Sequence, residues 1–321
     1  MRLSKKENLQ KQKITGDFLE IYVLTDTHDI VGVSGDPNAY KAVTHGGTRL
    51  HFQQKQKIEL FVQDVLENKP DAVLGLGDFF DAPAPIENFK QNWSRIPEPK
   101  GIMLGNHDYS LMGKNNAESS YQHLSHELQF CERMVNAGSK LNQSFYVNKG
   151  DIEVKVIMCD FSLTKDNAGS IVHHANVMGT ILPEQLEWIK EELLNSRTNK
   201  VILASHHGMH FSFYFADEYA TALKDTIGKV KAVNPKLTVL GVFGHNHVYQ
   251  PVRIENMLPE MLCYNASASI ERYKDIEESK HTTYYTVINV YKSKFTVSKR
   301  PMTYTGLQPK DWSIYNDKSN S

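Results

Sequence analysis

Short apolar runs recur along the chain, and polar residues with titratable or metal-binding side chains follow several of them at once. The runs are short and rich in Val, Ile, Leu and Phe, a pattern typical of buried β-strands. We predict such strands at residues 18–25, 72–76, 101–104, 201–205 and 237–243. The segment 105–108 that follows the third run contains Gly and Asn, which predicts a tight turn.

In the segments between these strands, apolar residues are spaced as in helices rather than strands. In 49–68, apolar residues recur at helical spacing, and Pro183 with nearby acidic residues is typical of a helix start. We predict helices at 49–68, 87–94, 121–136, 183–194 and 218–230. We predict a hairpin from 144–148 and 152–161, and a meander of strands from 250–254, 261–264, 282–290 and 294–298. The segments 29–48 and 162–180 are predicted to be long loops.

Alternation of strands and helices predicts an α/β fold. No internal repeat or linker divides the 321 residues, so we expect one domain over 18–304. The segment 1–17 is polar and Lys-rich, and 305–321 is predicted to be a polar C-terminal tail.

Composition narrows the class of protein and its surroundings. The formal net charge is −1, which disfavours a strongly basic nucleic-acid binder. The three Cys residues are widely spaced, as expected for reduced thiols in a reducing compartment. The first 17 residues contain no apolar signal-peptide core, and no stretch approaches the length of a membrane span. We therefore expect a soluble cytoplasmic protein with no membrane partner.

Candidate metal ligands follow five of the predicted strands. The carboxyl ends of strands in an open α/β sheet commonly form the ligand site, so these side chains are expected to converge. Each motif alone is more typical of a cap, a turn or a surface histidine, but five in this order are hard to explain by structure alone. The candidates are Asp26, His28, Asp78, Asn106, His206, His245 and His247.

Three oxygen donors and four imidazoles suit Mn²⁺, Fe or Zn²⁺ better than Ca²⁺. Seven ligands exceed the needs of one ion, whereas two ions about 3.5–4 Å apart that share one carboxylate would use them all. Such a pair binds a phosphoryl group and lowers the pKa of a bridging water. The predicted reaction is hydrolysis of a phosphoester by a metal-bridging hydroxide.

The order Asp-x-His, Gly-Asp, Gly-Asn-His-Asp, His, Gly-His-x-His resembles the calcineurin-like metallophosphoesterase superfamily over roughly residues 18–300. The resemblance implies a four-layer α/β/β/α sandwich of two mixed sheets flanked by helices, and two divalent ions, with Mn²⁺ favoured over Fe or Zn²⁺. It assigns Asp26, His28 and His247 to one metal, and Asn106, His206 and His245 to the other. Asp78 would bridge them. His107 would stabilise or protonate the leaving oxygen, held by a carboxylate for which Asp108 is the candidate.

Two substrate-side residues have open alternatives. His206 and His207 are adjacent, and a one-residue slip would exchange their faces, so either could be the ligand. If His206 is the ligand, His207 is expected to line the pocket. Arg49 could bind a substrate phosphate through its planar guanidinium, or could be a solvated residue in the first turn of a helix.

The stretch Gly46-Gly47-Thr48-Arg49 and the segment 183–188 are also similar to manganese-dependent ADP-ribose/CDP-alcohol diphosphatases, although His28 stands where we expect Gln. We predict hydrolysis of a phosphodiester, pyrophosphate or phosphomonoester bond in a small nucleotide-like molecule. The alternatives are a nuclease of the same superfamily, which would need a basic groove, or a metal-binding scaffold without activity.

Overall fold

The computed structural model describes twelve segments of the chain. They are residues 18–28, 57–80, 86–110, 142–165, 167–169, 171–173, 178–209, 216–246, 251–253, 261–265, 282–303 and 314–316. Several predictions lie outside the described residues: the loop 29–48, the helix 121–136, the first part of the helix 49–68, Arg49 and His247.

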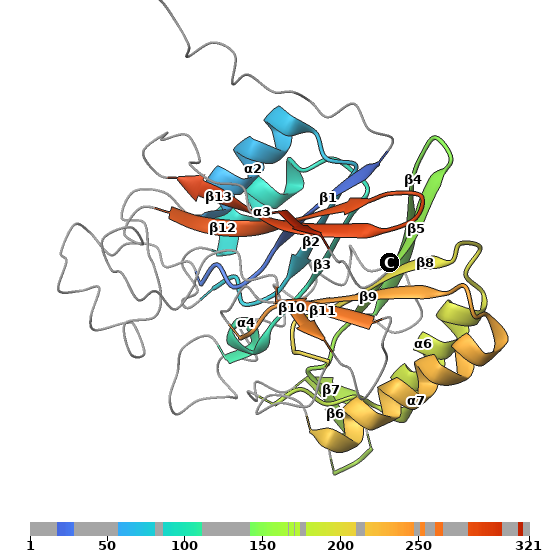
Figure 1. Ribbon diagram of the computed structural model, residues 1–321. Coiled ribbons are helices and arrows are strands. Elements are labelled where there is room, and N and C mark those ends of the chain that lie inside the picture. Colours follow the sequence, from blue (N-terminus) through green and yellow to red (C-terminus); the bar gives the residue numbers. More distant parts are fainter. Residues whose placement is uncertain are drawn as a thin grey trace, which may run out of the picture.

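Two six-stranded mixed sheets form the centre of the molecule (Figure 1). The first sheet has the order β14-β13-β12-β1-β2-β3, in which β1, β2 and β3 are parallel and β12 is antiparallel to β1. Its strands are β1 (Leu19–Leu24), β2 (Ala72–Leu76), β3 (Lys100–Met103), β12 (Thr282–Val290), β13 (Phe295–Thr303) and β14 (Ile314–Asn316).

The second sheet has the order β10-β11-β9-β8-β5-β4, in which β5, β8, β9 and β11 are parallel. Its strands are β4 (Gln143–Lys149), β5 (Ile152–Cys159), β8 (Lys200–Ser205), β9 (Thr238–Phe243), β10 (Pro251–Arg253) and β11 (Met261–Asn265). A separate hairpin pairs β6 (Leu163–Lys165) with β7 (Ile171–His173).

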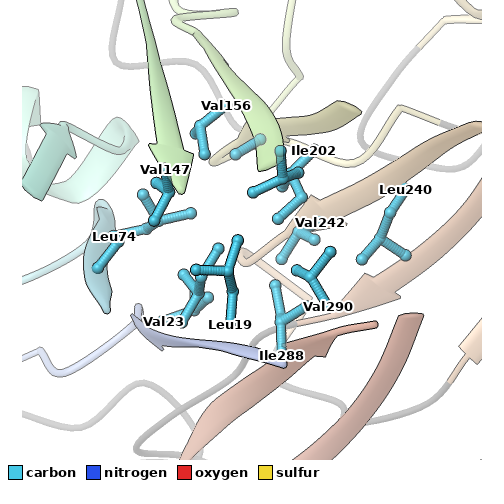
Figure 2. Packing of buried hydrophobic residues seen from close by; sticks show 14 of the residues in the cluster. Leu19, Val23, Leu74, Val147, Val156, Ile202, Leu240, Val242, Ile288 and Val290 are labelled. Carbon is cyan, nitrogen blue, oxygen red and sulfur yellow. The ribbon is translucent and has the colours of Figure 1, made fainter. Parts of the chain in front are cut away.

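A core of aliphatic side chains joins the facing sides of the two sheets (Figure 2). Alternation along β1 explains the layering, because Leu19 and Val23 point into this core whereas Tyr22 and Leu24 belong to a second core on the opposite face. The inter-sheet core takes further residues from β2, β4, β5, β8, β9 and β12, including Leu74, Val147, Val156, Ile202, Leu240, Val242, Ile288 and Val290.

Helices cover the outer face of each sheet (Figure 1). On the first sheet lie α2 (Lys57–Asn68) and α3 (Ile86–Ser94), and on the second α6 (Pro183–Leu194) and α7 (Asp217–Val233). The start of α6 is fixed as its sequence suggests, with Pro in the first turn and Gln185 Oε1 accepting the Leu182 N–H at 2.9 Å. The predicted four-layer α/β/β/α sandwich is confirmed.

The structure differs from the sequence expectations in four places. The predicted turn at 105–108 opens a short helix, α4 (Asn106–Ser110), in whose first turn the His107 N–H donates to Asp78 Oδ1 at 2.8 Å. The predicted loop 162–180 contains the β6-β7 hairpin, and β14 lies within the predicted polar tail.

The fourth difference is that the predicted C-terminal meander does not form one sheet. β10 and β11 join the second sheet, whereas β12 and β13 join the first. The alternating pattern identified these strands, but it carries no information about which strand each one pairs with. Among the helices of the described segments, none is long and apolar enough to cross a membrane.

Candidate active site

The carboxyl ends of the parallel strands place the predicted ligands in one buried cluster. Asp26 and His28 follow β1, Asp78 follows β2, and Asn106 follows β3 in the first sheet. His206 and His245 follow β8 and β9 in the second sheet. All six side chains are buried. The structure therefore brings together every predicted ligand that it describes.

Several of these residues have a positive backbone φ angle, which is uncommon for residues other than glycine. Among the described non-glycine residues, positive φ occurs at five, and four of them are site residues: Asp26 (54°), His28 (45°), Asp78 (53°) and His245 (71°). Such conformations persist where the surroundings hold them, and they cluster at functional sites. Here the ladder between β1 and β2 continues beyond the strands, with Asp26 N–H donating to Gly77 O at 2.9 Å and His28 N–H to Asp78 O at 3.0 Å.

Asp78 lies between imidazoles from the two sheets. Its Oδ1 accepts the backbone N–H of His107 at 2.8 Å. Its Oδ2 lies 3.7 Å from His28 Nε2 and 3.3 Å from His206 Nε2. Burial disfavours the charged form of Asp78, but neighbouring imidazoles, led by His206, outweigh burial and hold the pKa of Asp78 well below its usual range.

The backbone of β2 orients the His206 ring. Its Nδ1 lies 2.7 Å from the carbonyl oxygen of Leu76, to which it can only donate. In the neutral ring, Nε2 then presents a lone pair, and it lies 3.1 Å from His245 Nδ1 and 3.3 Å from Asn106 Oδ1. Burial lowers the pKa of His206, but carboxylates led by Asp78 and Asp26 outweigh it and raise the pKa to about 9. The cluster therefore attracts positive charge.

His207 has a different environment from its neighbour. It is fully buried, its ring centroid lies 4.8 Å from that of His245, and its backbone oxygen accepts a hydrogen bond from Ser205. Gly179 packs directly against its Cβ and Cγ. The ring that faces Asp78 and Asn106 is thus that of His206, and a contact between His207 and substrate stays a prediction.

Asp26 links the two sheets at the site. Thr25 Oγ1 donates to Asp26 Oδ2 at 2.7 Å, and the backbone N–H of His245 lies 3.0 Å from both carboxylate oxygens. Asp26 Oδ1 is also 3.9 Å from His28 Nε2. The carboxylate is therefore oriented from both sides before any ligand binds.

His107 is the one half-buried side chain of the cluster, and its ring meets the His28 ring edge-on with centroids 4.7 Å apart. Asp108, our candidate for holding that ring, is fully buried and instead accepts hydrogen bonds from three backbone N–H groups. Burial, followed by the charge of Asp78, raises the pKa of Asp108 to about 7.

Sequence comparison agrees with the motif order. Residues 19–249, more than two thirds of the chain, match the family model described as calcineurin-like phosphoesterase. The chain belongs to the calcineurin-like phosphoesterase family. It is therefore a phosphoric ester hydrolase, as the strand-end motifs predicted. A search of curated protein sequences gave no match.

Solved structures share the calcineurin-like phosphoesterase fold. One is a dimetal phosphatase from Danio rerio, with 13% identity and a TM-score of 0.55, covering 89% of this chain and 99% of that chain. Another is a 5'-nucleotidase from Candida albicans, with 13% identity and a TM-score of 0.50, covering 89% of this chain and 51% of that chain. At such identity these likenesses describe the fold alone.

The calcineurin-like phosphoesterase family implies a dinuclear divalent metal centre, and the described residues fit one. Two groups, His28 with Asp78 and His107, and Asp78 with His206 and His245, each hold donor atoms within 4.8 Å of one another. Asp78 belongs to both. Its Oδ2 is buried and accepts no hydrogen bond from the described residues, although His206 Nε2 lies 3.3 Å away. A cation between these atoms would satisfy both.

Sequence reasoning gave no role to three residues that shape this site. Gly105 and Gly244 leave room for the ligands, because a Cβ at Gly105 would lie 2.7 Å from His206 Cε1 and one at Gly244 would lie 2.5 Å from Asp26 Oδ2. Thr25 orients Asp26. Each glycine directly precedes a candidate ligand at a strand end, and that position was the available signal.

Proposed function

We propose that this phosphoesterase hydrolyses a phosphodiester, pyrophosphate or phosphomonoester bond of a small nucleotide-like molecule with the help of two Mn²⁺ ions. One observation carries the proposal. The buried Asp78 Oδ2, without a hydrogen bond from the described residues, faces imidazole nitrogens of both sheets. A carboxylate in that position is suited to two cations rather than one.

In this proposal Asp26, His28 and His247 hold one ion, and Asn106, His206 and His245 hold the other, with Asp78 shared. The convergence of Asp78, His206 and His245 supports the second set. For the first set, the distances from His28 Nε2 to Asp26 and Asp78 are 3.9 and 3.7 Å. His247 lies outside the described residues. Mixed oxygen and imidazole donors suit Mn²⁺, with Fe and Zn²⁺ as alternatives.

When bound, the ions would neutralise charge on the phosphoryl group and activate water. The protein's own contribution is positioning and proton transfer. His107 has the accessibility that a general acid needs, since it is the half-buried member of the cluster and lies beside His28 and Asp78. We propose that the His107 ring donates a proton to the leaving oxygen. Arg49 remains the predicted contact to a substrate phosphate.

A small substrate is favoured over nucleic acid because the formal net charge is −1. A pyrophosphate of the ADP-ribose or CDP-alcohol type is the narrower proposal, which rests on the segments around Arg49 and α6. A reducing, cytoplasmic location is also part of the proposal, and the free, buried thiol of Cys159 supports it.

The test combines metal analysis with hydrolysis on one sample. Protein stripped with a chelator is reloaded with Mn²⁺, Fe²⁺ or Zn²⁺ and assayed on bis-p-nitrophenyl phosphate, p-nitrophenyl phosphate, ADP-ribose, cyclic nucleotides and single-stranded DNA. We expect about two ions per chain and metal-dependent turnover of a small substrate. Preference for DNA would favour a nuclease. Absence of both metal and turnover would refute the proposal.

A further inference from the structure

We propose that Asp108 is a positioning residue that sets Asp78 and Asn106 in the geometry needed for metal binding, and that it takes no part in proton transfer by His107. The inference rests on the proposed function, because it assigns metal-binding roles to those two residues. It changes the role that the motif order gave to Asp108.

The carboxylate of Asp108 ties together the segments that follow β2 and β3. Its Oδ1 accepts the backbone N–H groups of Phe79 at 2.8 Å and Phe80 at 3.1 Å, and its Oδ2 accepts that of Gly105 at 2.8 Å. Phe79 directly follows Asp78, and Gly105 directly precedes Asn106. One buried side chain thus fixes the backbone beside one candidate ligand from each strand.

Asp78 makes a second connection between the same two segments, this time from the β2 side. Its Oδ1 accepts the backbone N–H of His107, which is the residue before Asp108. The two carboxylates therefore hold the two segments together reciprocally. With Oδ1 engaged, Asp78 directs Oδ2 toward His28 and His206. Its positive φ of 53° also needs a fixed backbone, which the bonds to Phe79 and Phe80 supply.

The bonds of Asp108 do not go to the ring of His107. All three hydrogen bonds that Asp108 accepts from the described residues come from backbone N–H groups, and its side chain is fully buried. A residue that orients a catalytic histidine has to bond to its ring. The bonds of Asp108 instead end on the backbone that directly follows Asp78 and on the backbone that directly precedes Asn106. Its loss is therefore expected to appear in metal affinity.

The test compares Asp108→Asn with a matched control, Asp71→Asn. Asp71 Oδ2 also accepts a backbone N–H, that of Glu20 at 2.8 Å, but at the opposite end of β1 and β2. The readouts are the Mn²⁺ dissociation constant from equilibrium dialysis, kcat at saturating Mn²⁺, the pH profile of kcat, and the melting temperature.

For Asp108→Asn we expect a Mn²⁺ dissociation constant raised about 10-fold to 100-fold, the usual effect of losing a partner that orients metal ligands. We expect kcat at saturating Mn²⁺ to recover to within about threefold of wild type, with the pH profile unchanged, because chemistry resumes once the ions are bound. Asp71→Asn should lower the melting temperature and leave Mn²⁺ affinity unchanged.

An unchanged Mn²⁺ affinity with a lower kcat and a shifted pH profile would overturn the inference and return Asp108 to proton transfer. If Asp108→Asn does not fold, Asp108→Ser, which adds no bulk and keeps one acceptor oxygen, carries the same test, and a wild-type Mn²⁺ affinity there would also overturn it. Wild-type protein that binds two ions and hydrolyses none of the substrates would refute the proposed function, whereas the affinity comparison would still decide the role of Asp108.

Discussion

Gly105→Ala is the most direct perturbation of the proposed metal centre, because it adds a single methyl group where two candidate ligands meet. A Cβ at this position would lie 2.7 Å from His206 Cε1 and 2.7 Å from the backbone nitrogen of Asp78, and closer still to Asp78 Oδ1. Ordinary van der Waals contact begins at about 3.4 Å. Asp78 or His206 must therefore move.

The size of that movement sets the expected effect. Relief of the contact with His206 requires about 0.7 Å, and relief of the contact with Asp78 Oδ1 requires about 1 Å. A displacement of about 1 Å at a reacting centre costs about 100-fold in rate, or about 2.7 kcal/mol of transition-state stabilisation. We expect kcat/KM to fall by about this factor and bound Mn²⁺ to fall with it.

Gly228→Ala is the matched control. Gly228 lies in the middle of α7, and a Cβ there would meet nothing within 4 Å. Replacement of glycine within a helix is expected to stabilise by about 0.5–1 kcal/mol. This variant should melt at a higher temperature and keep wild-type kcat/KM. The assay is Mn²⁺-dependent hydrolysis of bis-p-nitrophenyl phosphate, with bound metal and melting temperature measured on the same samples.

If Gly105→Ala retains kcat/KM within about twofold and full Mn²⁺ content, the close approach of Asp78 and His206 is not required for activity. The argument for a metal centre built on that approach would then fail. If both glycine variants lose activity equally, the effect is not specific to the site.

Three further outcomes are expected. Asp78→Asn should lose Mn²⁺ and activity together, and a variant with full metal content and full activity would exclude the bridging role. His107→Ala should lower kcat by about 100-fold to 10,000-fold while metal content stays near wild type, whereas equal loss of both would make His107 a ligand. Burial tends to raise the pKa of Glu192, but hydrogen bonds led by that from Lys155 outweigh it and lower the pKa. Glu192→Gln should therefore cost about 1 kcal/mol of unfolding free energy at neutral pH, a difference present above the unfolded pKa of 4.5 and lost as pH falls through the lowered value. Urea unfolding across that range measures it, and a difference that persists in acid would contradict the assignment.

Much of the fold follows from local pattern. The strand β2 and the helix α6 were predicted with their observed bounds, since a continuous apolar run and a proline-initiated amphipathic segment are both local signals. Pairing is not local. The segments that form β10 to β13 were identified as strands, but the sequence gives no sign that β12 crosses to pair with β1.

In the candidate site, too, some features follow from local sequence and others depend on contacts between distant segments. Residue types at strand ends predicted the cluster of Asp26, His28, Asp78, Asn106, His206 and His245, because the fold rule that brings strand ends together is general. Which of the two adjacent rings, His206 or His207, faces Asp78 could be read only from coordinates, since it depends on a bond to Leu76 in the other sheet. The bonds of Asp108 to backbone N–H groups also have no sequence signature.

The bonds of the site cross between the two sheets, and this couples metal binding to the packing of the sandwich. The backbone N–H of His245, after β9, donates to Asp26, and the ring of His206, after β8, donates to the carbonyl of Leu76 at the end of β2. The convergence of Asp78 with His206 and His245 spans the same boundary. Ions bound there would stabilise the folded state by mass action, and part of that energy would hold the sheets together at their carboxyl ends. Sequence change in the inter-sheet core can therefore alter metal affinity without contact with a ligand, since a shift of one sheet relative to the other separates the halves of the site.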